Sequence, residues 1–200
     1  PNTVALRDKD LGIWNEITWK QYNDNVSYLA LGLAKRGFKA GDVLGLIGDN
    51  KPSWIFFELA AQAAGGMSLG VYRDTLDEEV GYLMDAAKVS FVYAEDQEQV
   101  DKILTIKRPK NNPINIFYDD SRGLKELNDP NITDMLDLIY EGKALTSKDP
   151  EKYNKMIDKV SGEQNAILCT TSGTTSNPKL AMLPGGKFVD HVTRYLNVDP

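Results

Sequence analysis

A run of seven small polar residues, TTSGTTS at positions 170–176, follows directly on an apolar segment near the C-terminal end of the chain. Side chains this short and polar cannot build a hydrophobic core, so the run points to a site that uses backbone amides and hydroxyls. Consecutive backbone N–H groups form a concave anion site, and Gly173 permits backbone conformations that residues with a Cβ resist. Lys179 adds a full positive charge on a flexible stem, which suits a phosphate. Ser172, Thr174 and Thr175, on either side of the glycine, add hydroxyl donors. The chemistry of this loop is that of a polyphosphate cradle.

The loop is not a Walker A loop, although the spacing from Gly173 to Lys179 nearly imitates one. Pro178 stands where the second glycine would be, and Leu180 stands where the Mg²⁺-binding Ser or Thr would be. The loop at 170–179 is therefore predicted to bind phosphate by the same chemistry as a Walker A loop but with a different sequence pattern.

The segments on either side of the loop must place it at the edge of a sheet. NAILCT at 165–170 predicts a strand of about 20 Å, at ~3.3 Å per residue, and KLAML at 179–183 predicts its partner strand. In open α/β sheets, ligands bind at the carboxyl ends of the strands, which is where this loop would begin. Cys169 lies inside the apolar strand and is expected to be a small buried core residue.

Strand and helix signals alternate at short spacing through residue 118, which predicts a parallel sheet with helices on its faces. Short apolar or β-branched runs predict four strands, at 43–48, 66–72, 89–94 and 114–118. The segments between them predict helices at 52–64, from Thr75 onward, and at 96–106. The fold class is therefore α/β, with a mostly parallel sheet flanked by helices.

Two capping boxes mark predicted helix starts, because each pairs a hydroxyl with a carboxamide or carboxylate three residues later. The first is Thr18 with Gln21, and its helix ends before Gly37, which can adopt a left-handed conformation. The second is Thr75 with Glu78. From 119 to 163 the signal is weaker, with one helix predicted at 132–140 and another from Asp149 and Pro150 to about Val160.

The composition excludes several classes of protein. The net charge is −6 and the pI about 4.9, which argues against a nucleic-acid footprint. No apolar run approaches the ~20 residues that cross a bilayer. Cys169 is the only cysteine, which excludes an internal disulfide and fits a reducing cytoplasm. His191 is the only histidine, so the chain has too few cysteine and histidine residues for a Cys/His zinc site.

TSGTTSNPK at 171–179 resembles the signature TSGTTGxPKG of the adenylate-forming (AMP-binding) superfamily, which includes acyl-CoA synthetases, luciferases and peptide-synthetase adenylation domains. The upstream segment from ITWKQYN to GMSLGVY, residues 17–72, is similar to the opening of these enzymes, and EDQEQVDKIL at 95–104 favours the long-chain fatty acyl-CoA synthetase branch. In that family the loop holds the ATP phosphates. Seven positions match the signature: Thr171, Ser172, Gly173, Thr174, Thr175, Pro178 and Lys179.

The sequence departs from the family pattern in places. Ser176 replaces a glycine, Leu180 replaces the glycine after the lysine, and Pro184 and Gly185 stand where Ser or Thr and then His are usual. The family's later motifs are also missing: YGxTE, with its adenine contacts and Mg²⁺-binding glutamate, TGD for the ribose, and a C-terminal domain with the catalytic lysine. Residues 1–200 therefore resemble the truncated N-terminal part of an AMP-binding domain.

The resemblance implies an ATP-dependent long-chain fatty acid–CoA ligase as the complete enzyme. ATP with Mg²⁺ and a fatty acid would give acyl-adenylate and pyrophosphate, and CoA, the co-substrate, would then displace AMP. The phosphate-binding residues would be those of the signature loop: Thr171, Ser172, Gly173, Thr174, Thr175 and Lys179. Neither a catalytic residue nor a metal ligand is expected in these 200 residues, which alone should be inactive. The resemblance is consistent with a cytoplasmic protein that associates peripherally with a membrane.

Other interpretations stay open. The chain is also consistent with a non-catalytic, degenerate homologue that keeps the fold as an interaction module, which Ser176 and Leu180 favour. A third reading is an adenylating enzyme for another acid, such as an aryl or amino acid. A hydrolase triad of Ser172, Asp190 and His191 is disfavoured, because no G-x-S-x-G motif surrounds the serine.

Overall fold

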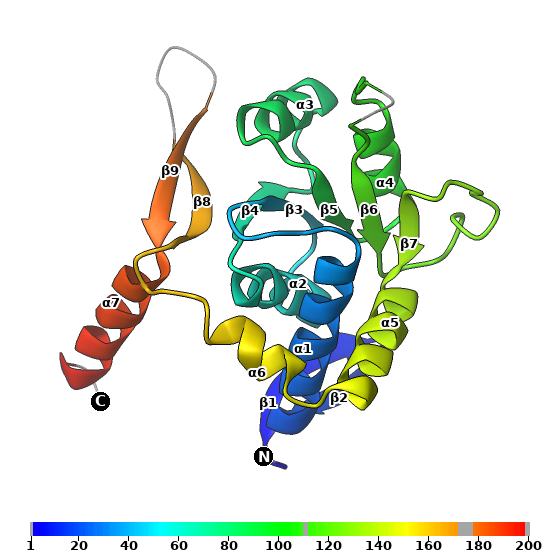
Figure 1. Ribbon diagram of the computed structural model, residues 1–200. Coiled ribbons are helices and arrows are strands. Elements are labelled where there is room, and N and C mark those ends of the chain that lie inside the picture. The colour runs from blue at the N-terminus through cyan, green and yellow to red at the C-terminus, as the bar shows by residue number, and fades with distance from the viewer. Residues whose placement is uncertain (1, 110–111, 172–177, 199–200) are drawn as a thin grey trace.

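The computed structural model describes residues 2–109, 112–171 and 178–198 of the 200-residue chain. Its main sheet contains β3 (Val43–Gly48), β4 (Met67–Tyr72), β5 (Phe91–Ala94), β6 (Asn115–Tyr118), β7 (Ile132–Asp134), β8 (Asn165–Thr171) and β9 (Lys179–Pro184). The strand order is β7-β6-β5-β3-β4-β8-β9 (Figure 1). All neighbouring pairs in this order are parallel except β8 and β9, which are antiparallel. The predicted α/β fold and the predicted pairing of the last two strands are confirmed.

The central strands are mainly apolar because helices cover both faces of the sheet. In β3, Val43 and Ile47 contribute to one core cluster, whereas Leu44 and Leu46 contribute to the other. Successive side chains of a strand point to opposite faces, so one continuous apolar run serves both clusters.

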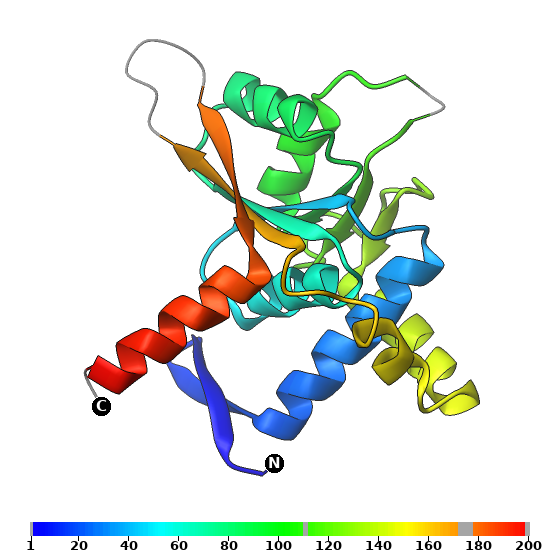
Figure 2. The same ribbon diagram turned by 60° about the vertical axis from the view of Figure 1, so that its left-hand side comes forward.

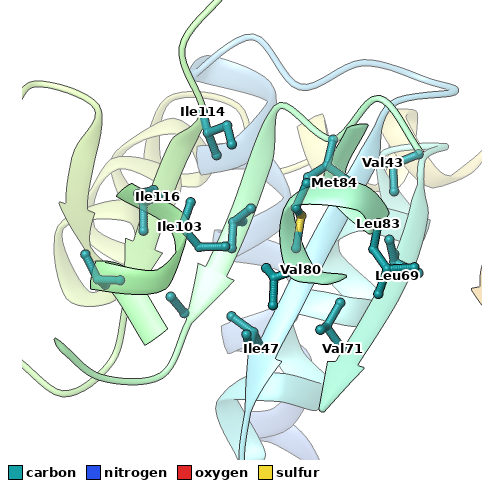
Figure 3. Packing of buried hydrophobic residues seen from close by; sticks show 14 of the residues in the cluster. Val43, Ile47, Leu69, Val71, Val80, Leu83, Met84, Ile103, Ile114 and Ile116 are labelled. Carbon is teal, nitrogen blue, oxygen red and sulfur yellow. The ribbon is translucent and has the colours of Figure 1, made fainter. Parts of the chain in front are cut away.

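Helices α3 (Asp77–Ala86) and α4 (Gln97–Leu104) cover one face. Their apolar side chains pack against the sheet residues of the first cluster (Figure 3). From α3, Val80, Leu83 and Met84 are buried, and from α4, Val100 and Ile103 are buried.

The opposite face is covered by α1 (Trp19–Lys35), α2 (Pro52–Ala63) and α5 (Met135–Lys148). Aromatic rings dominate this core. Phe57 of α2 stacks on Tyr93 with ring centroids 4.8 Å apart, and on Phe117 at 5.8 Å. This stack ties α2, which packs over β3 and β4, to the side chains of β5 and β6 as well.

Two glycines bring α1 and α5 into close contact. A Cβ at Gly142 would lie 1.9 Å from the backbone oxygen of Tyr28, and a Cβ at Gly32 would lie 2.7 Å from that of Leu138. Glu141 reinforces the contact, since it accepts hydrogen bonds from Arg36 Nε at 3.1 Å and Nη2 at 2.6 Å. Only a residue without a Cβ permits this separation between the two backbones.

The chain opens with an antiparallel hairpin, β1 (Val4–Asp10) and β2 (Ile13–Thr18), that forms a separate sheet. No element was predicted there, since charged residues interrupt the apolar pattern. The remaining helices are α6 (Lys152–Ile157) and α7 (Gly185–Val198). In the described part of the chain, no helix is long and apolar enough to cross a membrane.

The predicted helix starts had mixed outcomes. The Thr18–Gln21 capping box is confirmed, with both of its hydrogen bonds present. The Thr75–Glu78 box is wrong: α3 begins at Asp77 after the N-cap residue Leu76, because the amide of Thr75 is engaged in a turn with Tyr72 O.

The segment from 119 to 163 also differs from the prediction. Residues 132–134 form the edge strand β7 rather than the first turn of a helix, and α5 then runs on to Lys148. The next helix, α6, is shorter than predicted at both ends. Before it, Asp149 accepts a hydrogen bond from the amide of Glu151 in a turn, and the helix ends at Ile157.

Candidate functional site at the carboxyl edge of the sheet

The β8–β9 pair holds the base of the candidate phosphate loop. Thr171 ends β8 and lies opposite Lys179, which begins β9. The Thr171 hydroxyl donates to the backbone oxygen of Lys179 at 3.3 Å, and both side chains are exposed. The structure therefore brings together the two ends of the predicted site. Four predicted phosphate-binding residues lie outside the described residues: Ser172, Gly173, Thr174 and Thr175.

Lys179 keeps its charge available for a ligand. In the part of the chain that the structure describes, no carboxylate lies within 4 Å of its ammonium group. The other basic residues at this edge, Lys51 and Arg73, are both paired with carboxylates. An exposed, unpaired ammonium at the mouth of a loop is suited to attract an anion.

A contact from α3 braces the loop base. The phenolic hydroxyl of Tyr82 donates to the backbone oxygen of Pro178 at 3.2 Å. Tyr82 is not predicted from the sequence, because a tyrosine on an amphipathic helix resembles any other residue at the boundary of the buried face. Its position between Val80 and Leu83 would place it at the margin of the buried face, where a phenol can reach a polar partner.

A buried carboxylate organises the neighbouring strand ends. Glu95 follows β5 directly and is only 5% exposed. It accepts a hydrogen bond from the amide of Asp49 at 2.5 Å and pairs with the ammonium of Lys51 at 2.8 Å. Burial opposes the charge of Lys51, but the hydrogen bond and charge of Glu95, together with the charges of Asp119 and Asp120, outweigh it and raise the pKa of the lysine. Glu95 thus ties the turn after β3 to the turn after β5.

A second buried polar group lies beside it. Ser53, at the start of α2, donates to Asp119 Oδ2 at 2.7 Å, and its oxygen lies 2.8 Å from the hydroxyl of Tyr93. Since the serine proton goes to Asp119, Tyr93 is the donor to Ser53. Burial raises the pKa of Asp119 and also that of Tyr93. This chain of hydrogen bonds connects α2, β5 and the end of β6.

Arg73, just after β4, completes the edge. Its guanidinium lies 2.6 Å from Asp49, 3.8 Å from Asp96 and 3.6 Å from Glu98. Lys102 of α4 donates to the backbone oxygen of Arg73. These contacts join the turns after β3, β4 and β5 into one rigid rim, while Lys179 stays outside the network.

A cavity of about 350 Å³ reaches this edge between α2 and the strands β3, β4 and β8. Its lining includes Trp54, Glu58, Ser68, Gly70, Cys169 and Thr170. A Cβ at Gly70 would lie 3.1 Å from the Trp54 ring, so the glycine lets the indole lie close to the sheet. Burial raises the pKa of Glu58, which accepts a hydrogen bond from Ser68 at 3.2 Å.

Cys169 corrects an expectation. The strand pattern predicted a buried thiol, but Cys169 is exposed. The neighbouring residue Leu168 faces the first core cluster and is buried, so the alternation of the strand turns Cys169 to the other face. Helix α2 packs over β3 and β4 and leaves this side of β8 uncovered.

The described residues contain no group of three or more His, Cys, Asp or Glu side chains that could hold a metal ion. Asp190 and His191 lie on α7 and are both exposed. The features that the structure brings together at the carboxyl edge are therefore a rim of paired charges, a cavity, and the base of a loop where Lys179 has no carboxylate partner among the described residues.

A family model described as "AMP-binding enzyme" matches residues 1–199. The chain is 30% identical over 179 residues to the long-chain-fatty-acid–CoA ligase ACSBG2 of Rattus norvegicus, which covers 90% of this chain and 26% of the relative. It is 29% identical over 184 residues to the ligase ACSBG1 of the same species, covering 91% of this chain and 24% of the relative. The chain thus spans about a quarter of the length of these relatives.

Solved structures share the fold. The luciferase-like enzyme of the mealworm Zophobas morio superposes with a TM-score of 0.72 at 15% identity, over 91% of this chain and 39% of that one. The anthranilate CoA ligase AuaEII superposes with a TM-score of 0.70 at 18% identity, over 87% of this chain and 31% of that one. Since the family model spans nearly all of its residues, the chain belongs to the AMP-binding enzyme family.

Proposed function

We propose that the chain is the N-terminal part of an ATP-dependent long-chain fatty acid–CoA ligase. In this reaction the fatty carboxylate attacks the α-phosphate of ATP, which gives acyl-adenylate and releases pyrophosphate. The CoA thiol then attacks the acyl carbon and AMP leaves. The observation that carries the proposal is the position of Lys179, which is exposed, has no carboxylate partner among the described residues, and lies opposite Thr171 at the carboxyl end of β8. The relatedness to two fatty-acid–CoA ligases supports the choice of acid.

The loop at 170–179 would act electrostatically. Its amides and hydroxyls would hold the β and γ phosphates, and Lys179 would stabilise the charge that develops on the departing pyrophosphate. The proposed phosphate-binding residues are those of the signature: Thr171, Ser172, Gly173, Thr174, Thr175 and Lys179. The rim built on Glu95 and the brace from Tyr82 would keep the strand ends in place while this charge develops.

The rest of the enzyme would complete the site. In this proposal, residues outside this chain supply the adenine and ribose contacts, the Mg²⁺ ligand and the catalytic lysine. Mg²⁺ would neutralise phosphate charge when bound. Residues 1–200 alone are then expected to bind nucleotide weakly and to form no acyl-CoA.

The test is ATP–pyrophosphate exchange by the complete enzyme that carries Lys179→Ala. Loss of one preorganised donor at such a site lowers the rate about a hundredfold, or ~3 kcal/mol in the barrier. Lys187→Ala is a matched control, because Lys187 is also exposed and lies on α7, beyond the loop. An exchange rate unchanged by Lys179→Ala would refute the assignment of this loop.

Two alternatives rest on specific residues. Ser176 and Leu180 replace loop glycines of the family signature, which favours a non-catalytic homologue that uses the fold as an interaction module. Protection of the loop amides from hydrogen exchange by ATP would support the ligase, and indifference to ATP would support the module. If exchange occurs with an aryl or amino acid but not with a fatty acid, the enzyme adenylates a different acid.

A further inference from the structure

The hairpin β1–β2 ends in a two-residue turn, Leu11–Gly12, flanked by the paired residues Asp10 and Ile13. Both turn residues have positive φ, 46° at Leu11 and 85° at Gly12. A type I′ turn requires this geometry, and Asn-Gly is the sequence that adopts it most readily. Gly12 meets the requirement without strain, whereas a bulky residue such as leucine is an outlier in the left-handed region.

Leu11 is also the most exposed large hydrophobic side chain among the described residues, at 95%. A side chain that exposed gains almost nothing from packing, so nothing in the fold offsets its unfavourable backbone. Ile13 and Trp14 lie beside it and are 68% and 61% exposed. One residue therefore combines backbone strain with apolar exposure, and strain of this kind is typical of functional positions.

The surroundings of this tip are amphipathic and close to neutral. Residues 4–18 carry two basic and three acidic side chains. Arg7 and Glu16 pair with each other at 3.1 Å, and the ammonium of Lys9 lies 5.6 Å from the centre of the Trp14 ring. A tryptophan with a lysine above it presents an apolar body and a charged end, which suits the boundary between lipid and water.

We propose that the hairpin tip, defined as Leu11, Ile13 and Trp14, inserts into the surface of a zwitterionic phospholipid bilayer. A single leucine that protrudes from a tight turn fits a deformable lipid surface better than a protein interface, which needs a broad complementary patch. The near-neutral hairpin and the net charge of −6 favour zwitterionic over anionic lipid.

The position of the tip is compatible with catalysis in water. The hairpin lies at the end of the molecule opposite the end of β8 and the start of β9 in both views (Figure 1, Figure 2). A membrane bound at the hairpin would leave the base of the candidate phosphate loop facing the aqueous phase. The inference does not depend on the proposed ligase activity.

The test is flotation of the 200-residue chain with phosphatidylcholine vesicles. Leu11→Asn should lower the partition coefficient roughly tenfold or more, which is the scale for losing one buried leucine. Because this change creates the favoured Asn-Gly turn, the chain should stay folded, with an unfolding midpoint at or above that of the unaltered chain. Leu76→Asn is the matched control: Leu76 is 76% exposed, and asparagine suits its N-cap position on α3.

The proposal is supported if Leu11→Asn lowers the partition coefficient by about tenfold or more while Leu76→Asn leaves it unchanged. It is overturned if the unaltered chain fails to float, or if both variants lose binding equally. Binding that rises several-fold when phosphatidylserine is added would overturn it in favour of electrostatic attraction. A dimer in sedimentation without vesicles that Leu11→Asn dissociates would instead make the tip a self-association surface.

Discussion

Thr171 and Lys179 face each other across the β8–β9 ladder, and the hydroxyl of Thr171 donates to the backbone oxygen of Lys179 at 3.3 Å. Pro178, the preceding residue, accepts a hydrogen bond from Tyr82 at 3.2 Å. The backbone at the base of the loop is thus held from both sides, although the ammonium of Lys179 itself stays exposed and unpaired among the described residues.

Two lysines at this edge should respond differently to the same substitution. Lys179→Met removes an exposed charge without a carboxylate partner in the described residues, so the free energy of unfolding should change by no more than about 0.5 kcal/mol. Lys51→Met leaves the buried carboxylate of Glu95 without its ion pair. Since the Lys51 side chain is 38% exposed, the expected loss is about 1–2 kcal/mol, below that of a fully buried pair. Urea denaturation of the 200-residue chain measures both, and equal effects would contradict the assigned pairing.

Tyr82→Phe should loosen the loop base without unfolding the chain. The variant keeps the ring and loses the hydrogen bond to Pro178 O, so stability should fall by about 0.5–1 kcal/mol. Hydrogen exchange at the amides of Lys179 and Leu180 should accelerate more than exchange in β3. Tyr72→Phe is the control, since Tyr72 is 84% exposed at the end of β4. Unchanged exchange at β9 in Tyr82→Phe would show that the brace is not formed in solution.

The fold class could be predicted because its signals are local. The parallel strands appear in the sequence as short apolar runs, because helices cover both faces of the sheet. The Thr18–Gln21 capping box is formed by residues within one helical turn. The base of the candidate site followed from the same logic, because a polar run after an apolar strand falls at a sheet edge.

The rest of the site depends on contacts between distant segments, which no local pattern encodes. The Ser53–Asp119 hydrogen bond joins residues 66 apart in sequence, and the Tyr82–Pro178 bond joins residues 96 apart. The prediction of a Thr75–Glu78 box failed for a related reason: the turn after β4 takes the amide of Thr75, so the helix starts one residue later. The predicted burial of Cys169 was wrong because the sequence of an apolar strand does not show which of its two faces a helix covers.

Replacement by alanine should have opposite effects at two helical glycines, because Gly142 lies in the close contact between α1 and α5 and Gly81 of α3 does not. Gly142→Ala places a methyl 1.9 Å from Tyr28 O, so the helices must separate and stability should fall by about 2–3 kcal/mol. Gly81→Ala in α3 meets only Ile106, at 4.0 Å, and should stabilise the chain by about 0.5–1 kcal/mol through helix propensity. Thermal and urea unfolding measure both changes. A neutral Gly142→Ala would mean that the helices pack less closely than described.

Asp119 and Asp120 are neighbours whose pKa values shift in opposite directions. Burial raises the pKa of Asp119, although Ser53 donates to it. Hydrogen bonds from Arg122 lower the pKa of Asp120 to about 2. The contribution of Asp119 to stability is therefore complete below its unfolded value of 3.8 and is lost as the pH rises through its folded pKa. That of Asp120 is present above 3.8 and is lost as the pH falls towards about 2.

Asparagine substitutions separate these two contributions, because asparagine keeps the acceptor but cannot ionise. Asp119→Asn should gain stability relative to the unaltered chain as the pH rises from 3.8 through the folded pKa of Asp119, and the gain should then level off. Asp120→Asn should lose stability above pH 3.8, by less than about 1 kcal/mol because Arg122 is exposed, and should match the unaltered chain near pH 2. Urea unfolding between pH 2 and 8 gives both curves. If the two variants changed in the same direction at pH 7, the burial of Asp119 between Ser53 and the end of β6 would be wrong.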